Sequence, residues 1–220
     1  MKTTRLLQLR TLAAVALTAS LSLTSLSKAA LSIVGSKHDL SKYVNSGGNG
    51  TTQGTGQVCV ACHTPHNAQA TQLVPLWNHA PTTATFTLYT NSGTNSSLNA
   101  TTVTPTGSSK ACLSCHDGTI ALDSFGGKTP QAGVGVLTGS ANLSNDLSND
   151  HPVSFTYDSA LATADGGLVA PATTSLVGTL PLFSAKLECA TCHNPHDNTL
   201  APFLRKTTTG SALCLNCHSK

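Results

Sequence analysis

The sequence CATCHNPHDNTLAPFLRKTTTGSALCLNCH occupies residues 189–218 and holds two Cys-x-x-Cys-His motifs within 30 residues. Two further copies of the motif lie upstream, at residues 59–63 and 112–116. The four motifs use all eight cysteines of the 220-residue chain. They read Cys59-Val-Ala-Cys62-His63, Cys112-Leu-Ser-Cys115-His116, Cys189-Ala-Thr-Cys192-His193 and Cys214-Leu-Asn-Cys217-His218.

The spacing of each motif predicts covalent attachment of a c-type haem. Two thiols three positions apart can add to the two vinyl groups of one porphyrin, and the adjacent histidine then ligates its iron. Two simpler interpretations compete, because the cysteine pairs could build Cys₄ zinc sites or disulfides. Neither requires a histidine after every pair, which favours haem. The sequence therefore predicts four covalent haem c groups, with the proximal iron ligands His63, His116, His193 and His218.

Each iron needs a sixth ligand, and the sequence limits the choice. The only methionine is Met1, which lies in a segment that we expect to be removed. Five histidines lie outside the motifs, one more than four haems require: His38, His66, His79, His151 and His196. All four haems can therefore be bis-histidine and six-coordinate. The absence of methionine ligation predicts lower potentials, and a filled coordination shell favours electron transfer over catalysis.

Local sequence separates these five histidines. His66 and His196 each follow a motif histidine by three residues in matching C-x-x-C-H-x-P-H runs. This is too close to reach the far face of the same haem, so we expect each to ligate a neighbouring one. His79 follows Trp77, which could pack on a porphyrin. His38 precedes every motif and could reach back within the chain or across to another subunit.

The composition predicts a fold that is mostly irregular coil around a haem core. Aromatic residues number nine, and charged residues make up 10% of the chain. So few large apolar side chains make a conventional core difficult. We expect few short helices, at residues 111–116 and 212–218, and minor strand, at residues 85–89. Gly and Pro break longer elements elsewhere.

The N-terminus is typical of a secretory signal peptide, residues 1–29. Basic residues come first, an uncharged Leu- and Ala-rich run follows, and Ser27 and Ala29 provide small residues before a cleavage site. A retained membrane anchor is the alternative, but the run is interrupted by Thr and Ser and is shorter than the roughly 20 apolar residues of a span. Removal would change the net charge from +3 to −1, which gives no basic surface for nucleic acid. We expect an exported chain without a membrane span.

An internal repeat organises the rest of the chain. Residues 59–116 and 189–218 both contain C-x-x-C-H-x-P-H, then a Pro followed by apolar residues (PLWNHA and PFLRKT), then C-L-x-C-H. The first unit is longer because of residues 82–110, whose Thr, Ser, Asn and Gly predict a surface loop or short hairpin. We treat residues 30–220 as a single tetrahaem cytochrome domain, because distal ligands are expected to cross between the units.

Several segments together resemble the exported multihaem c-type cytochromes with doubled CxxCH motifs that occur in metal-reducing bacteria and some archaea. Within that group the outer-surface tetrahaem cytochromes are the most similar. The resemblance covers about residues 36–218 and implies extracellular filaments with one continuous haem chain, in which a distal histidine can come from the neighbouring subunit. We assign that role to His38. The segments are SKHDLS at 36–41, CVACHTPHNA at 59–68, PLWNH at 75–79, CLSCHDG at 112–118, HPVSF at 151–155 and CATCHNPHD at 189–197.

The favoured function is therefore electron transfer rather than enzymatic catalysis. A homopolymeric extracellular filament would exchange electrons with redox partner proteins and an extracellular acceptor. A monomeric periplasmic shuttle is the alternative. A multihaem reductase is less favoured because it needs an iron with an open site. A zinc-stabilised binding module is the remaining hypothesis.

Overall fold

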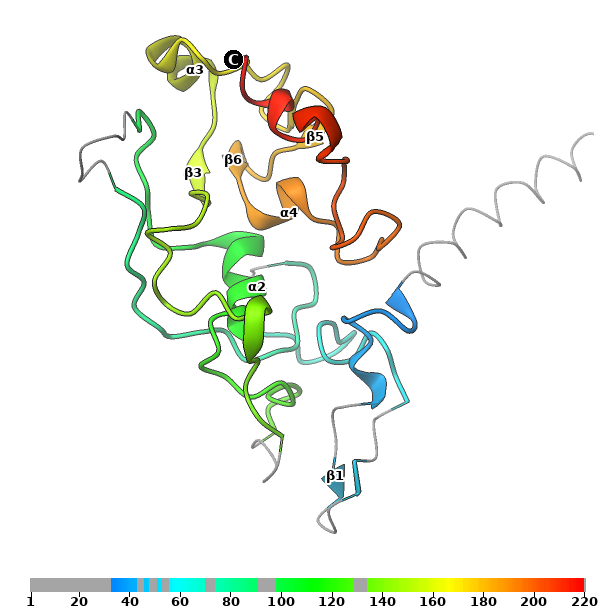
Figure 1. Cartoon of the computed structure of the whole chain (residues 1–220). Helices are drawn as coiled ribbons and strands as arrows, with labels where there is room; N and C mark the ends of the chain where they lie inside the picture. Colours follow the sequence, from blue (N-terminus) through cyan, green and yellow to red (C-terminus); the bar gives the residue numbers. More distant parts are fainter. Residues whose placement is uncertain are drawn as a thin grey trace, which may run out of the picture.

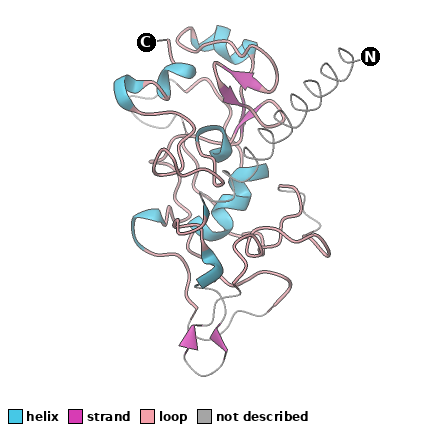
Figure 2. Ribbon diagram, turned by 90° about the vertical axis from the view of Figure 1, so that its right-hand side faces the viewer, coloured by secondary structure: helices cyan, strands magenta, loops and turns pink. Residues whose placement is uncertain are grey.

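The structure is a computed structural model that describes residues 33–42, 46–47, 51–52, 56–69, 74–90, 98–128 and 134–219. The expected signal peptide lies outside these residues. Turns and coil dominate, with short helices and two-residue strands (Figure 2), which confirms the expected fold class. Within the described ranges, no helix has the length and apolar character needed to cross a membrane. The helices are α2 (Gly107–His116), α3 (Ser159–Asp165) and α4 (Cys189–Cys192), and the 3₁₀ turns are η1 (Leu40–Lys42), η2 (Gly139–Ala141), η3 (Thr209–Ser211) and η4 (Cys214–Asn216).

Helix α2 lies in the centre of the molecule beside α4 (Figure 1). It contains the helix expected at residues 111–116 and begins four residues earlier. Ser109 and Ser114 are fully buried, and Leu113 is 1% exposed. Small side chains at two buried positions let neighbouring backbone approach closely. The second motif is therefore held on the most regular element of the fold.

The side-chain core lies in the C-terminal half. Strand β3 (Phe155–Thr156) pairs antiparallel with β6 (Lys186–Leu187), and β4 (Leu176–Val177) forms a hairpin with β5 (Leu180–Pro181). The separate strands β1 (Ser46–Gly47) and β2 (Thr51–Thr52) pair near the N-terminus. The main cluster is Phe155, Tyr157, Val177, Leu180, Leu182, Leu187 and Cys217.

The prediction of a strand at residues 85–89 is wrong. Thr87 forms a single parallel bridge with Asp146, through one hydrogen bond to Asn145 O (2.9 Å) and one from Leu147 N (2.8 Å). A segment with alternating apolar and polar residues forms a strand only when a second strand pairs with it. No described segment forms such a strand beside residues 85–89. The described parts of residues 82–110 form no paired hairpin either, and they lead directly into α2.

The helix expected at residues 212–218 shrinks to the 3₁₀ turn η4. The Asn216 side chain donates to the carbonyl of Ala212 (2.8 Å), which is the acceptor that the Asn216 N–H would use in an α-helix. The Asn216 N–H instead bonds Leu213 O at 3.3 Å. A polar side chain that competes with the backbone explains the shorter element.

Candidate haem-binding sites

All four motifs adopt a helical turn. In α2 the turn is part of the helix, and in the other three the histidine N–H bonds the carbonyl of the first cysteine. Residues at positions i, i+3 and i+4 of a helical turn share one face. Both sulfurs and the imidazole of each motif can therefore face one porphyrin. The distances are 2.8 Å for His63 to Cys59, 3.0 Å for His193 to Cys189 and 2.9 Å for His218 to Cys214.

The second and third motifs are in direct contact. The Cys112 thiol donates a hydrogen bond to the Cys189 sulfur, and this bond, followed by burial, holds the pKa of Cys112 above its ordinary value. The Cys189 N–H also bonds the hydroxyl of Ser109 at 2.9 Å. These contacts join α2 to α4, so the sulfurs of two attachment turns meet where the helices pack.

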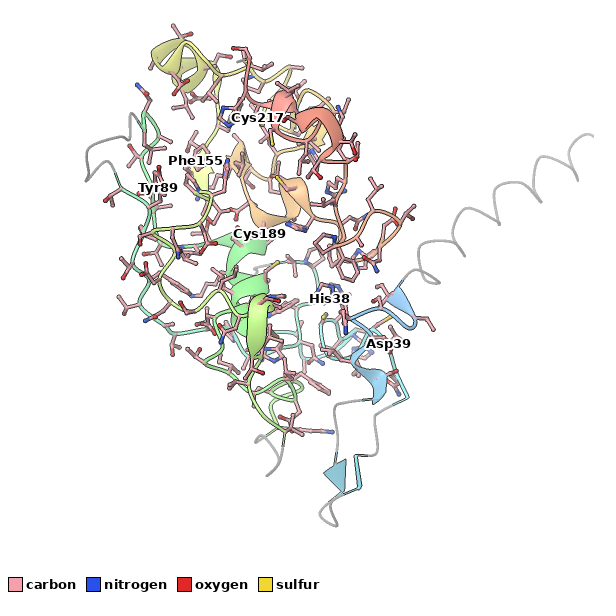
Figure 3. All side chains as sticks on the ribbon, viewed as in Figure 1. His38, Asp39, Tyr89, Phe155, Cys189 and Cys217 are labelled. Carbon is pink, nitrogen blue, oxygen red and sulfur yellow. The ribbon has the colours of Figure 1, made fainter. Side chains whose placement is uncertain are left out.

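The first and fourth motifs lie near this contact. Burial, and next the nearby Cys62, raise the pKa of Cys115 to about 12. Burial and then Cys217 raise the pKa of Cys192 to about 11. The first motif therefore lies near the second, and the fourth lies near the third. Figure 3 shows Cys217, Cys189 and His38 following one another down the view.

Backbone carbonyls fix three of the motif imidazoles through Nδ1. An N–H at Nδ1 that donates to a carbonyl leaves the Nε2 lone pair available for a metal. This is the tautomer that an iron-ligating histidine needs. The pairs are His63 with Pro75 O at 2.9 Å, His116 with Ala141 O at 2.7 Å and His193 with Pro202 O at 3.0 Å.

The loops that follow the first and third motifs have matching backbone geometry. Asn78 N bonds Cys62 O, and Arg205 N bonds Cys192 O, both at 2.9 Å. Leu76 and Phe203 follow the two prolines and both have a positive φ, 57° and 58°. The second loop reaches each equivalent contact with three residues fewer, so PLWNHA and PFLRKT occupy matching places.

Two non-motif histidines lie beside motif histidines of other segments. The rings of His38 and His116 have centroids 6.0 Å apart and planes at 82°. The rings of His63 and His196 also have centroids 6.0 Å apart, with planes at 24°. His196 thus lies next to the histidine of the first motif, although it follows the third motif in sequence.

His38 is held within this chain. Its ring stacks on Phe203, with centroids 4.3 Å apart. Burial, and next the nearby His116, lower the pKa of His38 to about 4, against the carbonyl of Pro195, which raises it. The imidazole is therefore neutral at pH 7, the form that binds metals.

His79 is buried beside the second motif. Its Nδ1 lies 2.9 Å from Ala80 O, and its Nε2 lies 3.1 Å from Ala121 O and 3.5 Å from the Cys115 sulfur. Burial lowers the pKa of His79, so the ring is neutral and carries one N–H for two carbonyls. His66 and His151 are exposed, and the structure brings neither one to a motif histidine.

The arrangement of the cysteines fits haem c. None of the eight cysteines, all of which are described, forms a disulfide. The described residues contain no group of three or more His, Cys, Asp or Glu side chains placed to hold a bare metal ion. Each motif places two sulfurs and one imidazole on one helical turn, which is the donor set of haem c.

The sequence did not single out Glu188, which is 1% exposed. Its carboxylate accepts hydrogen bonds from Ser109 N (3.2 Å), Ser154 Oγ (2.8 Å) and Thr106 Oγ1 (3.3 Å). It therefore joins the start of α2 to the start of α4. The available signal was an acidic residue directly before the third motif, in a chain with few charges.

Comparison with known proteins agrees with the chemistry of the sites. Residues 182–220 match the family described as the doubled CXXCH motif. The curated proteins contain no match to the chain. The matched residues contain the third and fourth attachment turns. The match and the four motifs together support a multihaem c-type cytochrome-like protein, with covalent haem c as its cofactor.

Proposed function

We propose that the chain is a tetrahaem electron carrier in which two cysteines and two histidines hold each haem. The observation that supports this most is the packing of α2 on α4, where Cys189 N bonds Ser109 Oγ at 2.9 Å and Cys112 lies beside Cys189. Bound haems supply one-electron chemistry, and the protein's part is to fix their spacing and ligands. Attachment turns that touch would hold neighbouring haems close enough for electrons to pass between them.

The chain's residues also favour transfer over catalysis. The carbonyls of Pro75, Ala141 and Pro202 orient three proximal imidazoles, so little rearrangement is needed when the iron changes charge. The supply of non-motif histidines can close the second face of each iron. A closed iron accepts and releases electrons but gives a substrate no place to bind.

The full proposal is a subunit of an extracellular cytochrome filament that passes electrons to an external acceptor. It is supported by the resemblance to outer-surface tetrahaem cytochromes and by the signal-like N-terminus. The chain would then associate with copies of itself and receive electrons from redox partner proteins. A monomeric periplasmic shuttle would need the same four haems without self-association.

The first test is haem content. The chain is expressed with its leader in a host that matures c-type cytochromes, and haem per chain is measured as the pyridine haemochrome after denaturation. We expect four covalent haems. The control is a double variant, Cys214→Ala with Cys217→Ala, which should carry three. A protein band that shows no haem peroxidase stain on a denaturing gel would reject haem attachment altogether.

The second test is assembly. Electron microscopy of the haem-containing material sheared from cells should show filaments with a continuous haem chain. Discrete small particles would leave the haems in place but support the shuttle. Carbon monoxide binding to the reduced protein at neutral pH would show an open iron and support a reductase instead.

A further inference from the structure

The two close histidine pairs have the separation of axial ligands on one metal ion. Metal–imidazole nitrogen bonds are about 2 Å long, so two imidazoles on opposite sides of one ion have ring centres about 6 Å apart. His38 and His116 have ring centroids 6.0 Å apart, and so do His63 and His196. In each pair one member is a motif histidine and the other is not.

We propose that His116 and His38 ligate one haem with nearly perpendicular imidazole planes, and that His63 and His196 ligate another with nearly parallel planes. This rests on the proposed tetrahaem function and adds the ligand pairing and the electronic character of two sites. The plane angles are 82° in the first pair and 24° in the second.

The contacts around His116 and His38 fix both planes. His116 donates through Nδ1 to Ala141 O at 2.7 Å, which sets its ring orientation at the end of α2. His38 stacks on Phe203 with planes 20° apart, and Phe203 lies in the loop that follows the third motif. The two rings are thus oriented by different segments, which explains how they stay nearly perpendicular.

The contacts around His63 orient the other pair. Its Nδ1 lies 2.9 Å from Pro75 O. The ring of Trp77 packs edge-on against the His63 ring, with centroids 6.3 Å apart. His196 comes from the C-x-x-C-H-x-P-H run of the third motif. This ligand would connect the first and third motifs, while His38 connects the N-terminal segment to the second. Both ligands lie within one chain, which differs from the expected bridging role of His38.

The two geometries differ in electron paramagnetic resonance. Perpendicular axial planes leave two iron d orbitals nearly equal in energy and give a low-spin ferric signal with very large anisotropy. Parallel planes separate these orbitals and give an ordinary rhombic signal. The oxidised protein should therefore contain at least one haem of each kind.

The experiment compares His38→Ala and His196→Ala with the unmodified protein, at equal haem content and by difference spectra. His38→Ala should remove one haem equivalent of the highly anisotropic signal, and His196→Ala one haem equivalent of the rhombic signal. Each loss should appear as a high-spin signal. Added imidazole should restore a low-spin signal, which shows a missing ligand rather than unfolding. Unchanged signals in either variant would overturn the pairing. So would loss of the rhombic signal in His38→Ala together with loss of the highly anisotropic signal in His196→Ala.

A second substitution tests the site if alanine disrupts folding. His38→Met replaces imidazole with a thioether ligand, which should give one haem a sulfur-to-iron charge-transfer band and a higher potential. A folded variant without that band would show that residue 38 does not reach an iron. A protein without haem would reject the proposed function itself, whereas four haems with an unexpected ligand pattern would reject only this pairing.

Discussion

Phe203 stacks on His38, with ring centroids 4.3 Å apart and planes 20° apart. Phe203 belongs to the loop of the third motif, and its φ of 58° lies in the left-handed region. His38 in turn lies edge-on to His116 of the second motif. One aromatic contact therefore orients the histidine that we pair with α2.

We expect Phe203→Leu to change the orientation of His38 while keeping haem attachment. Loss of the aromatic pair should cost about 1 kcal/mol of unfolding free energy. The highly anisotropic ferric signal should broaden or move toward the rhombic form, because the His38 plane is less constrained. Electron paramagnetic resonance and thermal unfolding measure the two effects. Phe183→Leu is the control, since Phe183 is 37% exposed. Equal spectra in both variants would show that Phe203 does not position His38.

Glu188 provides a test of how the second and third motifs are held together. Glu188→Ala would remove a buried carboxylate and leave Ser109 N and Ser154 Oγ without their acceptor. Hydrogen bonds to charged groups are worth about 1.5–3 kcal/mol each, so we expect a loss of about 3 kcal/mol of unfolding free energy. Chemical denaturation at fixed haem content measures it.

The control for Glu188 is Asp158→Ala, which removes the N-cap of α3 far from the motifs in sequence. Asp158 accepts from Leu161 N at 2.8 Å, and a lost N-cap costs about 1 kcal/mol. A Glu188 variant no less stable than the Asp158 variant would contradict the role of the carboxylate in joining α2 to α4.

Gly178 supports the fourth motif from the turn between β4 and β5. A Cβ at Gly178 would lie 2.6 Å from Asn216 Oδ1, and this oxygen accepts from Thr179 N at 3.0 Å. Gly210→Ala is a matched control, because Gly210 has a similar φ (59° against 54°) but no atom within 4 Å of that Cβ. Both should lose roughly 1 kcal/mol to left-handed strain, and Gly178→Ala should lose about 1–3 kcal/mol more to the displaced Asn216. Equal unfolding midpoints would contradict the close packing at Asn216.

The sequence predicted the features that depend on local spacing. The helix at the second motif and the alignment of Pro75 with Pro202 were predicted, and the structure reproduces the alignment in matching hydrogen bonds. The turns at the first and third motifs were not predicted from the sequence. The contact of His38 with His116 joins residues far apart in sequence. No local sequence pattern specifies which loops come into contact in the fold, so this contact could not be predicted. The strand expected at residues 85–89 failed for the same reason, because pairing depends on a partner elsewhere in the chain.

His79 is the next candidate for an iron ligand. Its Nδ1 lies 2.9 Å from Ala80 O and its Nε2 lies 3.1 Å from Ala121 O, so Nε2 can bind iron only if the Ala121 carbonyl moves away. We expect His79→Ala to convert one haem to high spin, as seen in absorption and electron paramagnetic resonance spectra, with four haems still attached. His151→Ala is the comparison, since His151 is exposed. An unchanged low-spin spectrum would identify the substituted histidine as the surplus one.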